Sequence, residues 1–168
     1  ATAAGPEADS LAARARDWLS AAADRALSLG SPEQSLAFLE QALSITLSGE
    51  ERASLLCRAG ESLMRAGRLE EGVVRSEEAI AACRELGQLA PVARITARLQ
   101  RPLATLGRLS ESIERLEAVR AELPEGSDAD LGRADVDVAL AYARRDAGDE
   151  PDASLRLAEE ALAIAERM

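Results

Sequence analysis

Arginine is the residue type whose spacing in this sequence best suits chemistry with another molecule. Arg94, Arg98 and Arg101 recur at intervals of four and three residues, so all three would lie on one side of a helix. Guanidinium groups present forked N–H donors that suit the oxygens of carboxylate or phosphate. The other candidate contacts for a binding groove are Arg65, Tyr142 and Arg145. The alternative interpretation is a solvated face, salt-bridged to nearby carboxylates.

The residue inventory argues against catalysis. All twenty basic residues are Arg, and the chain contains no Lys and no His. Without these residues there is no imidazole base, no imidazole metal ligand, no Schiff-base lysine and no P-loop lysine. The acidic turn around Asp149 does not have the spacing of an EF-hand loop. We therefore predict a chain that is not an enzyme and has no metal site and no cofactor.

The net charge of −10 disfavours direct binding to nucleic acid or to an anionic membrane, because both require a cationic face. No apolar run approaches the roughly 18 residues of a membrane span, and no signal peptide is visible. We expect a cytoplasmic protein. Cys57 and Cys83 are expected to be small buried side chains, and the alternative is a redox pair.

Four glycines punctuate the chain at nearly even intervals. Gly30, Gly67, Gly107 and Gly148 are separated by 37, 40 and 41 residues. Each glycine lies between two stretches with helical apolar periodicity, and glycine tolerates the left-handed conformation that ends a helix. The sequence therefore predicts four copies of one template, in which a helix, a glycine turn and a second helix follow one another.

Small residues recur in the second helix of each copy, where they would let two helices approach closely. They are Ser35, Gly72, Ser112 and Ser154. The predicted helices span about 9–29, 32–47, 50–66, 69–86, 90–106, 109–122, 129–147 and 151–167. Residues 1–8 are expected to form a flexible lead-in, and residues 9–168 a single domain with repeats at about 9–47, 50–86, 90–122 and 129–167.

These residues resemble the tetratricopeptide (TPR) repeat, which asks for a large residue, then Leu-Gly, then an aromatic residue in its first helix. The second copy matches best, with Leu56, Ala59-Gly60 and Leu63. The fourth copy departs most, because it has Asp137 and Arg144 where the pattern wants bulk. The resemblance implies an all-α fold: an α-solenoid of about four antiparallel helix pairs.

The period near 40 and the phrase GRLEEGVVRSEEAIAACRELG are similar to the TPR-like regions of large bacterial signalling proteins. In those proteins the region accompanies an ATPase domain and either a DNA-binding or a nucleotide-cyclase domain. The resemblance implies a non-enzymatic interaction or regulatory module that binds a protein, a peptide or neighbouring domains of its own chain. The alternative is a small-molecule sensor that controls an adjacent domain.

The ends of such a repeat array need a polar cap, and the last predicted helix has none after it. Either more chain follows, or this end pairs with a second copy in a homodimer. Family members that hold a peptide C-terminus use Lys and Asn pairs. This sequence contains neither residue, so a carboxylate clamp of that kind is not expected.

Overall fold

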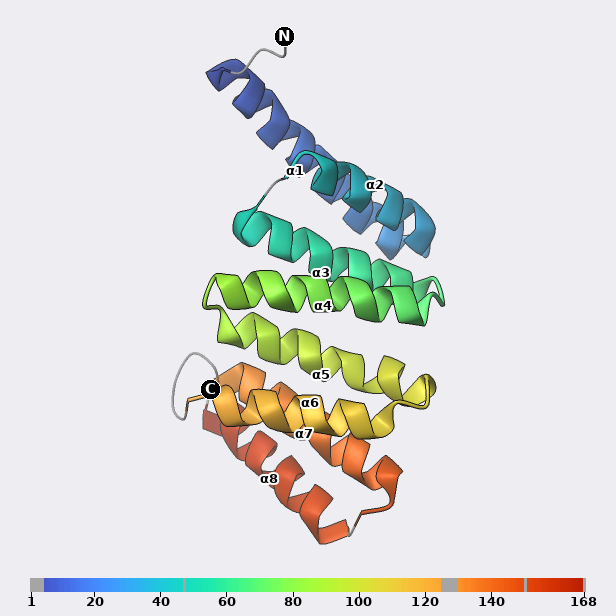
Figure 1. Ribbon diagram of the computed structural model, residues 1–168, viewed down its shortest axis with the longest axis vertical. Helices are drawn as coiled ribbons and strands as arrows, with labels where there is room; N and C mark the ends of the chain where they lie inside the picture. Colours follow the sequence, from blue (N-terminus) through green and yellow to red (C-terminus); the bar gives the residue numbers. More distant parts are fainter. Residues whose placement is uncertain (1–4, 47, 125–129, 150, 168) are drawn as a thin grey trace. The chain divides into compact units, whose positions relative to one another are not determined.

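The computed structural model describes residues 5–46, 48–124, 130–149 and 151–167. Within these residues the chain forms eight α-helices and no strand (Figure 1), which confirms the all-α prediction. The helices are α1 (Pro6–Ser28), α2 (Pro32–Ser44), α3 (Gly49–Arg65), α4 (Leu69–Glu85), α5 (Leu89–Thr105), α6 (Leu109–Glu122), α7 (Asp130–Ala147) and α8 (Pro151–Arg167).

Two of the predicted helix boundaries are wrong by three residues. The lead-in predicted for residues 1–8 is too long, because α1 begins at Pro6, where the fixed φ of proline suits the first helical turn. Residues 1–4 of that lead-in lie outside the described residues. Helix α2 ends at Ser44 rather than at 47. The hydroxyl of Thr46 donates to the carbonyl of Ala42 at 2.8 Å, which closes the last turn of α2.

The predicted glycine turns are present in all four copies. Gly67 has φ of 80°, the left-handed conformation that an L side chain rarely adopts. The amide of the next residue, Arg68, then donates back to the carbonyl of Leu63 at 3.0 Å. Such a bond satisfies a carbonyl at the helix end that would otherwise have no partner. The equivalent bonds after the other three turns come from Ser31, Arg108 and Asp149.

The chain divides into two compact units, Ala1–Ala82 and Cys83–Met168, and the boundary falls in the last turn of α4. Unit 1 is built from α1, α2, α3 and most of α4. Small residues mark its closest helix contacts. The hydroxyls of Ser35 on α2 and Ser62 on α3 lie 3.1 Å apart in the interior. A Cβ added to Gly60 on α3 would lie 3.1 Å from the carbonyl oxygen of Gly72 on α4.

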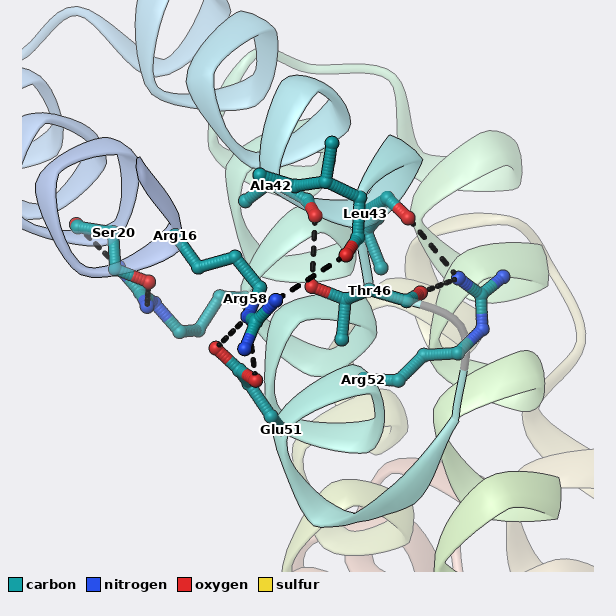
Figure 2. Close-up of polar contacts among 9 residues, drawn as sticks. Arg16, Ser20, Ala42, Leu43, Thr46, Glu51, Arg52 and Arg58 are labelled. Atoms are coloured by element: carbon teal, nitrogen blue, oxygen red, sulfur yellow. Dashed lines mark hydrogen bonds and ion pairs between the residues drawn. The ribbon is translucent and has the colours of Figure 1, made fainter. Parts of the chain in front are cut away.

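Arginine side chains of α3 tie the second pair of unit 1 to the first (Figure 2). Arg58 donates to the backbone carbonyl of Ser20 at 2.8 Å and to the carboxylate of Asp24 at 2.6 Å, both on α1. Arg52 donates to the carbonyl of Thr46 at 2.9 Å, just after α2. In the opposite direction, Arg16 of α1 reaches Glu51 at 2.8 Å. Adjacent pairs are therefore joined by charge-assisted bonds at the rim as well as by the core.

Unit 2 contains α5, α6, α7 and α8, in which α5 packs on α6 and α7, α6 on α7, and α7 on α8. Its core is mostly apolar, with Leu99, Leu103, Leu116 and Leu140 almost fully buried. At Gly132, α7 comes so close to α5 that an added Cβ would lie 3.0 Å from the Cβ of Ala93. Because α6 runs antiparallel to both neighbours, α5 and α7 run in the same direction (Figure 1).

Candidate interaction face

The three arginines predicted to share one side of a helix do so on α5. Arg94, Arg98 and Arg101 are all exposed, and the opposite side of α5 is buried. We call these three residues the arginine stripe. Within the described part of the chain, none of the three guanidinium groups has a hydrogen bond or an ion pair. The stripe therefore presents donor groups that no carboxylate of the described residues neutralises.

An apolar line runs along the exposed side of α7. Leu131, Val138 and Tyr142 are all well exposed there, at intervals of seven and four residues. The guanidinium carbon of Arg145 lies 5.0 Å from the centre of the Tyr142 ring, a cation–π distance. Arg145 also pairs with Asp146 at 2.8 Å. Tyr142 and Arg145, both predicted as contacts, thus touch each other.

Helix geometry places the arginine stripe and the apolar line on the same side of unit 2. Gly132 and Ala93 mark the seam where α7 meets α5. Each residue turns by about 100° around a helix axis. Counted from Ala93, the arginine stripe is rotated by roughly 80–140° around the axis of α5 in one sense. Counted from Gly132, the apolar line is rotated by roughly 80–120° around the axis of α7 in the opposite sense. Because the two helices are parallel and face each other at the seam, these opposite rotations place both sets of side chains on the same side of the pair.

We call this surface the α5–α7 face, made by the arginine stripe with Leu131, Val138, Tyr142 and Arg145. Asp135 and Asp146 are exposed on the same side of α7. Four arginines against two aspartates leave the face cationic, although the whole chain carries a net charge of −10. The sixth predicted contact, Arg65, belongs to unit 1 and pairs with Glu61 of its own helix at 2.7 Å. Arg65 therefore agrees with the alternative interpretation of a solvated, salt-bridged face, whereas the arginine stripe does not.

Sequence reasoning missed a second feature, a cavity of about 410 Å³ at the surface of α6, α7 and α8. The arginines that line it are Arg120, Arg144 and Arg156. Arg144 pairs with Glu117 across the cavity wall at 2.5 Å, and Arg120 pairs with Glu160. Two of the three arginines therefore already have carboxylate partners. The pairs join different helices, so no spacing within one helix could have indicated them.

Asp137 lies next to this cavity and is fully buried. One of its carboxylate oxygens accepts a hydrogen bond from Nε of Arg120 at 2.5 Å, and the other has no partner within the described residues. Burial raises the pKa of Asp137, and the Arg120 guanidinium, which acts to lower this pKa, offsets only part of that effect. The mismatch with the TPR pattern at Asp137 was the signal in the sequence.

The sequence also singled out the two cysteines and an acidic turn. Cys83 on α4 is buried and Cys57 on α3 is half-buried. Over the residues that the structure describes, no group of three or more Cys, Asp or Glu side chains is arranged to hold a metal ion. None of the helices in this part of the chain is long and apolar enough to cross a membrane. Glu150, in the acidic turn, lies outside the described residues.

Comparison of this chain with known proteins identifies its fold. No family model matches the sequence, and no curated protein does. Among solved structures, the chain resembles BtubC (BKLC) from P. vanneervenii, with a TM-score of 0.75, 18% identity and 91% of this chain covered. It spans 64% of the length of that protein. It also resembles MamA, with a TM-score of 0.67, 15% identity, and 90% of this chain and 79% of the other covered.

At these sequence identities the two similarities establish only the fold. The fold is an all-α solenoid of TPR-like antiparallel helix pairs, as the glycine spacing and the TPR-like positions predicted. That residues 9–168 form a single domain stays a prediction, and the chain divides into two compact units. The binding role of the six predicted contact residues also stays a prediction.

Proposed function

We propose that this chain is a protein-interaction module whose α5–α7 face binds a partner segment with acidic and apolar side chains. The observation that carries the proposal is the unpaired arginine stripe beside the exposed apolar line of α7. Carboxylates of the partner would accept hydrogen bonds from the guanidinium forks of the stripe. Apolar side chains of the partner would cover Leu131, Val138 and Tyr142, which removes apolar surface from water.

A partner could pair with the arginine stripe without displacing a carboxylate of the described chain. The guanidinium groups of the stripe have no internal ion pair that a partner would have to break. Because they are exposed, each new ion pair would contribute only about 0.2–1 kcal/mol, and salt would weaken it. The apolar line would then supply much of the affinity, and the stripe would supply specificity and a fast encounter.

The proposal extends to the setting of the module. We place it in the cytoplasm of a bacterium, as a non-enzymatic part of a larger signalling or transcription-regulatory protein. The support for this setting is the resemblance of residues 67–87 to TPR-like regions of such proteins and the absence of Lys and His. The bound segment would then belong to a separate protein or to a neighbouring domain of the same chain.

Fluorescence anisotropy with a labelled peptide tests the proposal. The probe alternates Glu and Leu over about eight residues, which extend to roughly 26 Å, the length of a helix such as α5. The test variant carries Arg94→Gln, Arg98→Gln and Arg101→Gln. We expect its affinity to fall about tenfold, since three exposed ion pairs at roughly 0.5 kcal/mol each are lost.

Two controls sharpen the result. A variant with Arg14→Gln and Arg25→Gln removes two exposed arginines of unit 1 and should bind as the parent does. A peptide with Gln in place of Glu should bind the parent and the test variant equally. If the test variant keeps the parent affinity for the acidic peptide, or if no peptide binds, the proposal is wrong.

A second candidate function is the sensing of a small anion in the cavity of α6, α7 and α8. The observation in its favour is the volume of about 410 Å³ with three arginines in its lining. A ligand with two carboxylates would have to displace Glu117 and Glu160 from Arg144 and Arg120. Titration with succinate tests it: a rise in melting temperature that Arg144→Gln abolishes would support it, and no change would exclude it for this ligand.

A further inference from the structure

The cavity of α6, α7 and α8 lies where the fourth copy of the template departs from the others. Arg144 lines this cavity and occupies the position of Leu63 and Leu103 in the second and third copies. Those two leucines are buried, whereas the side chain of Arg144 is 31% exposed. A charged side chain therefore replaces apolar bulk at one wall of the cavity.

A second departure leaves the space between α6 and α8 without the ion pair that the template has elsewhere. In unit 1, Arg75 of α4 reaches Glu40 of α2 at 2.6 Å. Counted from the small residue near the start of each second helix, the equivalent residues in unit 2 are Leu157 of α8 and Glu117 of α6. Leucine cannot form this ion pair, and Glu117 pairs instead with Arg144 of α7 at 2.5 Å. The cavity is thus lined by side chains that are particular to the fourth copy.

Two charged side chains of α8 in the lining have unused hydrogen-bonding capacity. Nε of Arg156 donates to the backbone carbonyl of Asp152 at 3.3 Å, and its guanidinium has no carboxylate partner within the described residues. Glu160 pairs through Oε2 with Arg120, and its Oε1 has no partner in the same part of the chain. Arg156 and Glu160 lie four residues apart, on one side of α8, but do not pair with each other.

The charges around the cavity balance. Its lining has three arginines and two glutamates, and the buried Asp137 behind Arg120 adds a third carboxylate when it is ionised. A balanced set gives little attraction to a ligand with a net charge of either sign. Opposite charges at separate points instead complement a ligand that carries both. The rest of the lining is apolar and consists of Ala121, Leu140 and Leu157.

We infer that the cavity binds a small zwitterion with an aliphatic side chain, the chemical class of α-amino acids such as leucine. The ligand carboxylate accepts hydrogen bonds from the guanidinium of Arg156, and the ligand ammonium donates to Oε1 of Glu160. Residues four apart on a helix have Cβ atoms about 5–6 Å apart, and one carbon joins the two charged groups of an α-amino acid, so a single ligand reaches both. Its side chain lies against Leu140 and Leu157, out of water.

This binding mode keeps the existing ion pairs of the cavity. A dicarboxylate would have to displace Glu117 and Glu160, whereas the zwitterion uses only the groups that are still free. The volume of about 410 Å³ is within the range of small-molecule sites. The inference rests on the second candidate function, that this cavity holds a small ligand, and it does not involve the α5–α7 face.

Three probes of similar shape test the inference. L-leucine carries both charges, 4-methylpentanoate lacks the ammonium, and 3-methylbutylamine lacks the carboxylate. Each is titrated into the full chain while amide chemical shifts are recorded. We expect leucine to give saturable shifts that are largest along residues 117–121 and 156–160. Each analogue should bind about fivefold more weakly, because it lacks one ion pair at a partly exposed site.

Two variants assign the two charges of the ligand to their partners. Arg156→Gln should weaken leucine binding about fivefold and leave the binding of 3-methylbutylamine unchanged. Glu160→Gln should weaken leucine binding to the same extent and leave the binding of 4-methylpentanoate unchanged. The control Arg25→Gln, at an exposed arginine of unit 1, should bind leucine as the parent does. Circular dichroism checks that each variant keeps its helices.

The outcomes separate this inference from the function on which it rests. If 4-methylpentanoate binds as tightly as leucine, or succinate binds and leucine does not, the cavity is a site for anions; the inference is then overturned while the second candidate function stands. If leucine, its analogues and succinate all fail to bind, both are wrong. Leucine binding that Arg156→Gln leaves unchanged also overturns the inference.

Discussion

Asp137 occupies a position of the template that the first two copies fill with leucine and the third fills with Thr96. The equivalent residues are Leu19 in α1 and Leu56 in α3. Asp137 is fully buried, and one of its carboxylate oxygens has no partner within the described residues. Burying an ionised carboxylate in this way is unfavourable unless its partners compensate fully. Replacement of Asp137 by leucine is therefore expected to stabilise the fold.

The size of the gain follows from the contacts that Asp137→Leu removes and keeps. The substitution removes the desolvated charge and the bond to Arg120. The side chain of Arg120 is 30% exposed and keeps its ion pair with Glu160, so it is not left as an unpaired buried charge. Replacement of a buried ion pair by apolar side chains gains up to about 4 kcal/mol in other proteins. Losing the partly exposed pair offsets about 1 kcal/mol. We expect a net gain of about 1–2 kcal/mol at pH 7.

The gain should depend on pH with a definite sign. The pKa of Asp137 in the folded chain is raised above its ordinary value of 3.8, so the folded state holds this proton more tightly than the unfolded state. The stability that Asp137 contributes is fully present below pH 3.8 and is lost as the pH rises through the raised pKa. The advantage of Asp137→Leu should therefore grow from acidic to neutral pH and then level off.

Urea unfolding of both chains from pH 4 to pH 8 measures this advantage. Asp137→Asn is the matched control, because it keeps an acceptor oxygen for Nε of Arg120 but cannot ionise. Its stability relative to the Leu variant should not change over this range. If Asp137→Leu is less stable than the parent at pH 7, or if its advantage is the same at every pH, the carboxylate is not the strained group that we describe.

Two further predictions concern the core of unit 1. Leu39→Ala, at a position that is almost fully buried, should lower the free energy of unfolding by about 2–5 kcal/mol in urea titration; a loss below 1 kcal/mol would contradict the packing of α2. Gly60→Ala places a Cβ 2.5 Å from the hydroxyl of Ser76 and should lower the melting temperature through overpacking of about 1–3 kcal/mol. Ser76→Ala in the same chain should restore part of that loss, and a simple sum of the two effects would argue against the clash.

The helices and turns followed from local chemistry. Glycine at the four turns and small residues in the second helices act through nearest neighbours, so their spacing predicted the pairs. The shared side of Arg94, Arg98 and Arg101 followed in the same way from the helical period. The ends of α1 and α2 were misplaced because the start at Pro6 and the bond from Thr46 to Ala42 depend on single residues at the boundary.

Contacts between helices could not be predicted from the sequence. The pairing of Arg120 with Asp137 and of Arg144 with Glu117 joins residues 17 and 27 positions apart, and no helical period links them. Whether an arginine is paired or unpaired is decided by such contacts. Arg65 is the exception, because its partner Glu61 lies four residues earlier on the same helix, so the helical spacing could have separated it from the arginine stripe.

Amide chemical-shift mapping of the chain during titration with the Glu–Leu peptide shows whether the peptide binds at the α5–α7 face. We expect saturable shifts that are largest along residues 94–101 of α5 and 131–145 of α7, with little change along α2 or α3. Shifts centred on other helices, or none at concentrations that saturate the anisotropy signal, would contradict it.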